Sequence, residues 1–151
     1  MKKILLLTFF ACVSLACNDD EVYSQIPSAP VLIELRLDFD DNKLQGTLAY
    51  KEITQPRLAK ERIGYGGILV INGFGQGTVN LYAYDLSCPV EVNKNIRIKP
   101  DDTGKATCPK CGAVFNIAFG NGTPESGTKH YLKSYPVYRV PGGGNTYQVT
   151  N

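Results

Sequence analysis

Residues 81–89 have the sequence LYAYDLSCP, in which an alternating run ends at a cysteine. Apolar and polar side chains alternate from Val79 to Leu86, which is typical of a half-buried strand. The apolar run 67–72 precedes it and predicts a buried strand, and Asn72-Gly73 between the two is a strong turn signal. The sequence therefore predicts a hairpin whose second strand ends directly at Cys88.

Twenty residues after Cys88, the segment 108–112 has the sequence CPKCG, a turn of the metal-knuckle type. Its two thiolates, at positions i and i+3, face one concave loop where backbone N–H groups can hydrogen-bond the sulfurs. A zinc ribbon would need a second pair of cysteines, and only Cys88 remains. A thioredoxin-like pair should open a helix, whereas residues 114–119 are predicted to form a strand.

The remaining sequence also favours strands joined by turns. Trp is absent, Gly (15) and Pro (9) are frequent, and no helical stripe is visible, so we expect one all-β domain. Gln55 to Arg62 is expected to be a loop or a single turn, and 120–124 a turn. Further strands are predicted at 31–37, 44–50, around 92–98, 132–140 and 146–149.

The order and spacing of these features resemble the Rieske iron–sulfur family, whose two loops carry the motifs C-x-H and C-x-x-H-G. The resemblance covers residues 68–149. It implies a small antiparallel β-sandwich of the Rieske type with two ligand-bearing loops at one tip. It also implies a [2Fe–2S] cofactor, with two cysteines on one iron and two histidines on the other.

The ligands of that family do not carry over intact. Cys88 and Cys108 stand at its two cysteine positions. Val90 stands at the first histidine position and cannot bind a metal, and Cys111 stands at the second. The single histidine, His130, lies outside both loops and is expected to be a surface or strand-edge residue. This chain alone therefore cannot supply a two-histidine cluster.

Three interpretations of the thiols remain open. In the first, the cluster is lost, two thiols form a disulfide (Cys88 with Cys108 or with Cys111), and the domain is a binding or structural module. In the second, the three thiolates and a fourth ligand such as Glu91 hold a [2Fe–2S] cluster, and the protein carries electrons. In the third, the thiols bind Zn²⁺ with Glu91 or water as the fourth ligand.

Catalytic chemistry has little support in the sequence. A Ser–His–acid set is missing because His130 is alone, and the Asp pairs 40–41 and 101–102 are typical of turns. Thiol–disulfide exchange through Cys108 and Cys111 is the only enzymatic hypothesis. We therefore expect a protein that is not an enzyme.

The first residues have the pattern of an export signal. Lys2 and Lys3 precede an apolar run that ends at Ser14-Leu15-Ala16-Cys17, as in a lipoprotein signal whose Cys17 receives the lipid. The sequence thus predicts a signal peptide at 1–16, an acidic tether at 17–30 and a β domain at 31–151. The acidic tract 18–21 resembles the surface-export signal of lipoproteins in the Bacteroides group. This predicts an outer-membrane lipoprotein, periplasmic or surface-exposed.

The charge of the mature chain argues against one class of partner. The chain has 16 basic and 14 acidic residues, and removal of Lys2 and Lys3 with the signal leaves 14 of each. A neutral domain without a basic stripe is not expected to bind nucleic acid. The expected partners are the membrane, through the lipid on Cys17, and an unidentified protein or glycan.

Overall fold

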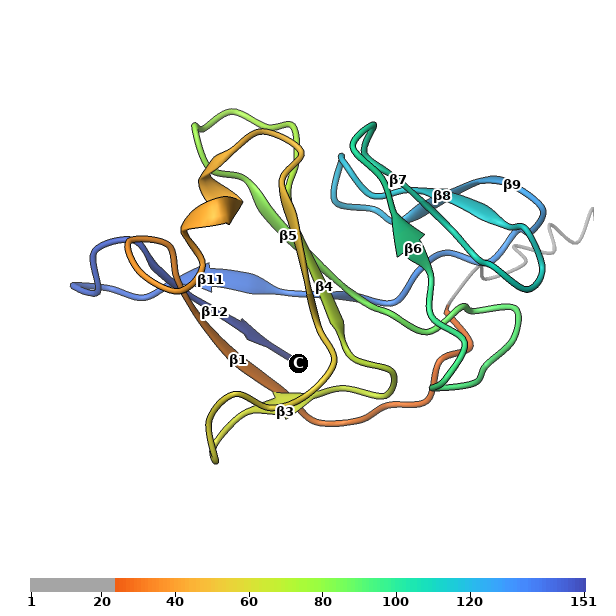
Figure 1. The fold of residues 1–151 in the computed structure, drawn as a ribbon, viewed down its shortest axis with the longest axis horizontal. Helices are drawn as coiled ribbons and strands as arrows, with labels where there is room; N and C mark the ends of the chain where they lie inside the picture. Colours follow the sequence, from red (N-terminus) through yellow and green to blue (C-terminus); the bar gives the residue numbers. More distant parts are fainter. Residues whose placement is uncertain (1–23) are drawn as a thin grey trace, which may run out of the picture.

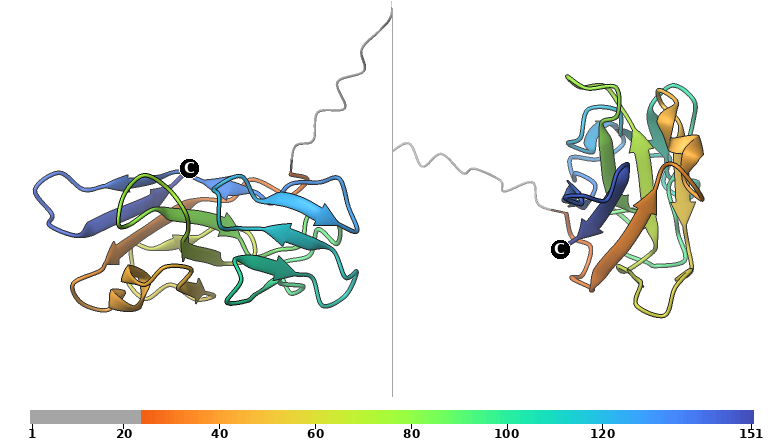
Figure 2. Two further views of the ribbon diagram at one scale, coloured as in Figure 1. Left: turned by 90° about the horizontal axis from the view of Figure 1, so that it is seen from above. Right: turned by 90° about the vertical axis from the view of Figure 1, so that its left-hand side faces the viewer.

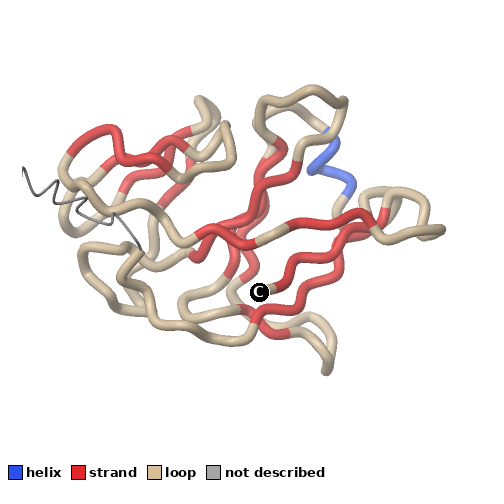
Figure 3. The backbone as a smooth tube through the Cα atoms, turned by 180° about the vertical axis from the view of Figure 1, so that it is seen from behind, coloured by secondary structure: helices blue, strands red, loops and turns tan. Residues whose placement is uncertain are grey.

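The structure, a computed structural model, describes residues 24–151. Within this range the fold is all-β, and its helix is one short 3-10 turn, η1 (Asn42–Gln45) (Figure 3). The strands are β1 (Val31–Arg36), β2 (Tyr50–Ile53), β3 (Arg62–Ile63), β4 (Ile68–Asn72), β5 (Leu81–Asp85), β6 (Lys99–Pro100), β7 (Lys105–Thr107), β8 (Val114–Asn116), β9 (Thr123–Ser126), β10 (Ser134–Tyr135), β11 (Val137–Arg139) and β12 (Thr146–Thr150). They form three antiparallel sheets with the orders β11-β12-β1-β3, β10-β5-β4-β2 and β6-β7-β8-β9.

The first two sheets pack together around one hydrophobic core. In β1 the buried side chains alternate with the more exposed ones, and Ile33 and Leu35 are fully buried. They share a core cluster with Ile68 and Val70 of β4 and with Val149 of β12. The strands predicted at 31–37 and 146–149 are therefore confirmed, and the alternation arises because one face of each strand meets the second sheet.

The second sheet also packs against the third, so strand β4 is buried on both faces. All five of its residues are buried, which confirms the continuous apolar strand predicted there. Leu69 and Ile71 join a second core cluster with Tyr84 of β5 and Phe115 of β8. Figure 1 shows β4 and β5 between the other sheets, and Figure 2 shows the first and third sheets towards opposite ends of the molecule.

The prediction of a strand at 44–50 is wrong. Residues 42–45 form η1 instead, and β2 begins only at Tyr50. Leu48 has a positive φ of 58°, a conformation that interrupts an extended strand. The buried carboxylate of Asp41 also fixes the chain here, since its Oδ2 accepts the backbone N–H of Arg36 at 2.8 Å.

The third sheet differs from its predicted boundaries. The strand expected around 92–98 is reduced to an isolated bridge between Ser87 and Arg97, and β6 follows it.

Strand β9 begins at Thr123, inside a segment expected to be a turn, and it includes Pro124. Because β9 is the last strand of its sheet, one of its edges is unpaired, and Pro is tolerated there. Pro136 divides the strand expected at 132–140 into β10 and β11.

The last part of the predicted tether contacts the domain. Ile26 is buried, and the ammonium group of Lys133 donates to the carbonyl oxygens of Ile26 and Pro27. The signal peptide, Cys17 and the acidic tract lie outside the described residues. Among residues 24–151 there is no helix with the length and apolarity needed to cross a membrane.

Candidate functional site

Three cysteine sulfurs meet where two loops come together. Cys88 follows strand β5, Cys108 follows β7, and Cys111 precedes β8. Their Sγ atoms all lie within 4.8 Å of one another, and those of Cys88 and Cys111 are 3.7 Å apart. Cys88 and Cys108 are buried, Cys111 is exposed, and all three are free thiols. These three close cysteines could bind a metal ion.

The sheets explain why these sulfurs meet. Strand β5 belongs to the second sheet and delivers Cys88 into the core between that sheet and the third, where Cys108 also packs. The hairpin of β7 and β8 brings Cys108 and Cys111 to the same place, because residues 108–113 form its closing loop. The backbone N–H of Cys108 donates to the carbonyl of Ala113 at 2.9 Å and closes that loop.

Backbone N–H groups of both loops act on two of the sulfurs. Those of Val90 and Glu91 act to lower the pKa of Cys88, and those of Lys110 and Cys111 act to lower the pKa of Cys108, through hydrogen bonding to sulfur. Such bonds stabilise a thiolate over a thiol. The two loops therefore present N–H groups to sulfur, as a metal-knuckle turn is expected to do.

The two buried thiols differ in acidity. Burial raises the pKa of Cys88 to about 12 in spite of its N–H partners. Burial also opposes ionisation of Cys108, but the N–H groups of Cys111 and Lys110 and the neighbouring thiols outweigh it. The pKa of Cys108 is therefore lower than its ordinary value. In the metal-free protein Cys108 ionises more readily than Cys88, because the neighbouring thiols lower the pKa of Cys108 and raise that of Cys88.

Glu91 lies beside this site, in contact with the opposite loop. Its Oε2 is 2.5 Å from Nζ of Lys110, and its side chain is only 13% exposed. The ammonium group of Lys110 is exposed, and the carboxylate beside it raises its pKa. The pair links the loop of Cys88 to the loop of Cys108.

Other residues named from the sequence take no part in the cluster. Val90 is 41% exposed. His130 lies in the segment between β9 and β10, where its backbone N–H donates to Oγ1 of Thr128 at 3.1 Å. Among the described residues, the group of potential metal ligands that lie close together consists of the three cysteines.

The chain after the CPKC turn continues into a strand. Ala113 is followed directly by β8, and residues 108–113 contain no helix. A thioredoxin-like site places its cysteine pair at the start of a helix, so this geometry does not favour that chemistry.

Two features of the site were not visible in the sequence. Val92 has a positive φ of 47°, which is exceptional for a β-branched residue. Its carbonyl oxygen accepts the hydroxyl of Tyr65 at 3.2 Å, a contact between residues 27 positions apart. A Gly or Asn at position 92 would have signalled the turn, but Val gives no such signal.

A [2Fe–2S] cluster of the Rieske type does not fit the donors present. It needs two imidazole ligands, and the single histidine of the sequence, His130, is not among the potential ligands that lie close together. Comparison of the chain with protein-family models, with curated proteins and with solved structures gives no significant match.

Proposed function

We propose that this chain is an exported, lipid-anchored lipoprotein of the outer membrane. In this proposal its Rieske-like domain has lost both histidine ligands and acts as a non-catalytic binding or structural module. The observation that carries the proposal is the convergence of three thiols on two loops whose histidine positions are taken by Val90 and Cys111. A disulfide between these sulfurs, or a metal ion bound by them, would connect the second sheet to the third.

The proposed role of the thiols is supported by their place in the core. Cys88 and Cys108 are buried in the cluster that the second and third sheets share. A small exported domain gains stability from a metal ion or a disulfide that joins two such elements. For a disulfide, two thiols lose two protons and two electrons to a thiol oxidant of the cell envelope.

A second candidate function is electron transfer by a [2Fe–2S] cluster held by the three cysteines and a non-standard fourth ligand. The N–H groups that face Cys88 and Cys108 favour it, since such groups tune the potential of iron–sulfur clusters. The short distances between all three sulfurs argue against it. Thiolates on two different irons would be separated by both metal atoms, whereas here every pair lies within 4.8 Å.

The site is tested by analysing the full-length protein, purified anaerobically from cells in detergent. Iron, acid-labile sulfide, zinc and free thiols are measured per chain. The structural module predicts no iron and no labile sulfide, with the thiols either bound to zinc or joined in a disulfide. Stoichiometric iron and sulfide with visible absorption would contradict it and establish the electron carrier.

The anchor is tested separately with cells that express the full-length chain. Labelled fatty acid should be incorporated and the protein should sediment with the outer membrane, since two or more acyl chains hold a protein stably on a bilayer. Cys17→Ser should abolish both results, while Cys111→Ser should change neither. Membrane association of the Cys17→Ser protein without label would contradict the lipid anchor.

A further inference from the structure

The two cysteine loops share one backbone design, although their sequences share only the Cys-Pro pair. Residues 88–92 have the sequence CPVEV, and residues 108–112 have the sequence CPKCG. In the first loop the N–H of Val92 donates to the carbonyl of Cys88 at 3.0 Å. In the second, the N–H of Gly112 donates to the carbonyl of Cys108 at the same distance. Each loop therefore closes with the same bond, from its fifth residue to its cysteine.

The similarity extends to the fifth residue and to the sulfur contacts. Val92 and Gly112 both have positive φ, 47° and 74°. In both loops the N–H groups of the third and fourth residues favour the thiolate of the first residue. Gly adopts this backbone without strain, whereas a β-branched residue does so at a cost. The first loop keeps the knuckle geometry in spite of Val92, as strained positions at functional sites do.

This correspondence gives Glu91 a defined position. Glu91 is the fourth residue of its loop, as Cys111 is of the other, and in a metal knuckle that residue is the second ligand. Its carboxylate lies beside the opposite loop, because Oε2 contacts Nζ of Lys110. The carboxylate of Glu91 is not among the ligand atoms that already lie together, so its side chain has to turn from Lys110 towards the sulfurs to bind the ion.

The distances between the sulfurs suit a single ion. Zn–S bonds of about 2.3 Å in a tetrahedron place neighbouring sulfurs about 3.8 Å apart. The sulfurs of Cys88 and Cys111 are 3.7 Å apart, and Cys108 lies within 4.8 Å of both. A small inward movement of Cys108 would complete the three-sulfur face.

We propose that Cys88, Cys108, Cys111 and Glu91 bind one tetrahedral Zn²⁺ ion, with one residue pair from each of two matching knuckle loops. The inference rests on the proposed structural role of the thiols and names the ion that joins them. Binding displaces the thiol protons, and the ammonium of Lys110 offsets part of the negative charge that remains. Soft thiolate donors in a tetrahedral set favour Zn²⁺ over Mg²⁺ or Ca²⁺.

The test is metal binding by the full-length chain, purified under reducing conditions and stripped with a chelator. Co²⁺ is titrated while its visible absorption is recorded, and Zn²⁺ is then used to displace it. We expect one equivalent of Co²⁺ with the intense ligand-field absorption of a tetrahedral ion, and complete displacement by Zn²⁺. Absence of binding, or weak absorption typical of octahedral cobalt, would overturn the inference.

The role of Glu91 is tested by substitution. Glu91→Gln should weaken Zn²⁺ binding at least ~10-fold and change the cobalt spectrum, because a charged ligand is lost. Glu91→Cys should bind Zn²⁺ at least as tightly as the native chain, since it completes a four-cysteine set. Tight binding by this variant would also show that the loop still folds when Glu91 is replaced. Glu125→Gln is a matched control because Glu125 also pairs with a lysine, Lys105, at 2.6 Å, and it should bind Zn²⁺ normally. If Glu91→Gln keeps the native Zn²⁺ affinity and the native cobalt spectrum, Glu91 is not a ligand.

The outcomes separate this inference from the proposed function. A disulfide between Cys88 and Cys111 in protein taken from cells, with no metal bound after reduction, would overturn the zinc site and leave the structural module standing. Iron with acid-labile sulfide would overturn both.

Discussion

Val92 has a strained backbone that closes the loop of Cys88. A left-handed conformation costs an ordinary residue about 1–2 kcal/mol, and the φ of Val92 is 47°. Val92→Gly should therefore leave the free energy of unfolding unchanged or raise it by up to about 1 kcal/mol, as measured by urea denaturation. Val90→Gly, two residues away, relieves no such strain and should lower it by about 0.5–1 kcal/mol. Equal losses in both variants would contradict the assigned strain.

The three thiols differ in their access to solvent. Cys111 is exposed, whereas Cys88 and Cys108 are buried. In the reduced, metal-free protein, iodoacetamide should modify Cys111 first and Cys88 last, because burial also keeps the Cys88 thiol protonated. Peptide mapping by mass spectrometry after short exposures gives the order. Modification of Cys88 before Cys111 would show that the loops are arranged differently.

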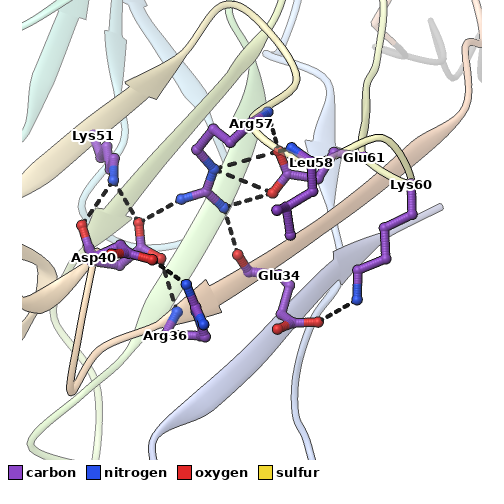
Figure 4. A network of polar contacts seen from close by, with 9 residues as sticks. Glu34, Arg36, Asp40, Lys51, Arg57, Leu58, Lys60 and Glu61 are labelled. Carbon is purple, nitrogen blue, oxygen red and sulfur yellow. Dashed lines mark hydrogen bonds and ion pairs between the residues drawn. The ribbon is translucent and has the colours of Figure 1, made fainter.

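Among the structural elements, the loop 54–61 is held by one arginine. The guanidinium of Arg57 contacts Oε1 of Glu61 at 2.7 Å (Figure 4) and Oδ1 of Asp41 at 2.9 Å, and both carboxylates are buried. It also donates to the carbonyl oxygen of Glu34 in β1 at 2.5 Å. The loop, which the sequence predicted only as a loop or a single turn, is therefore fixed by an ion pair with Asp41, just after β1, and by a hydrogen bond to Glu34 in β1.

Loss of this arginine leaves the buried carboxylate of Glu61 without its ion-pair partner, while Asp41 keeps its pair with Lys51 at 2.7 Å. Arg57→Ala should lower the free energy of unfolding by roughly 2–4 kcal/mol, and Arg57→Lys by less, since lysine lacks the planar fork. Chemical denaturation measures both. Lys60→Ala is the control, because the pair of Lys60 and Glu34 is more exposed and should contribute little. A small effect of Arg57→Ala would show that the loop is held by other contacts.

The same contacts make the loop sensitive to acid. Burial raises the pKa of Glu61, but hydrogen bonds from the side chain and backbone of Arg57 outweigh it, and the pKa lies below the ordinary value of 4.5. The stabilisation is therefore fully present above pH 4.5 and is lost as the pH falls through the lower, folded value. Glu61→Gln should be less stable than the native chain at neutral pH, and the difference should shrink below pH 4.5. A constant difference in unfolding free energy across the acid range would contradict this.

The sequence allowed some elements to be predicted better than others. The positions of β1, β4, β5 and β12 were predicted closely, and in β1 and β4 the apolar pattern also matches the burial. The prediction that β5 is half-buried is wrong, because β5 packs against both neighbouring sheets and four of its five residues are buried. The strands of the third sheet are two to four residues long, too short for a periodic signal. At the site, the cysteine spacing predicted that two loops carry the thiols. The contact of Glu91 with Lys110 depends on how those loops meet, and spacing alone does not contain that information.

In the whole molecule, the thiol site lies where two sheets join. Cys88 follows strand β5 of the second sheet and Cys108 follows strand β7 of the third. Both pack in the core that these two sheets share. A bound ion stabilises the folded state in proportion to the logarithm of its concentration above Kd, provided that the unfolded chain binds it less tightly. Zn²⁺ at about 100 times Kd should thus raise the free energy of unfolding by about 2.7 kcal/mol, and addition of a chelator should reverse the gain. An unfolding midpoint that does not respond to Zn²⁺ would contradict a structural ion.

The convergence of the three thiols can be tested without assuming which metal they bind. Arsenite reacts with three neighbouring thiols to form three As–S bonds with release of three water molecules, and it needs the sulfurs close together. The reduced full-length protein is treated with one equivalent of arsenite, alkylated and mapped by mass spectrometry. We expect Cys88, Cys108 and Cys111 to be protected together, and protection of the remaining Cys88 and Cys111 to be weaker in Cys108→Ser, where only two As–S bonds can form. Alkylation of any one of them in the arsenite-treated native chain would contradict a common site.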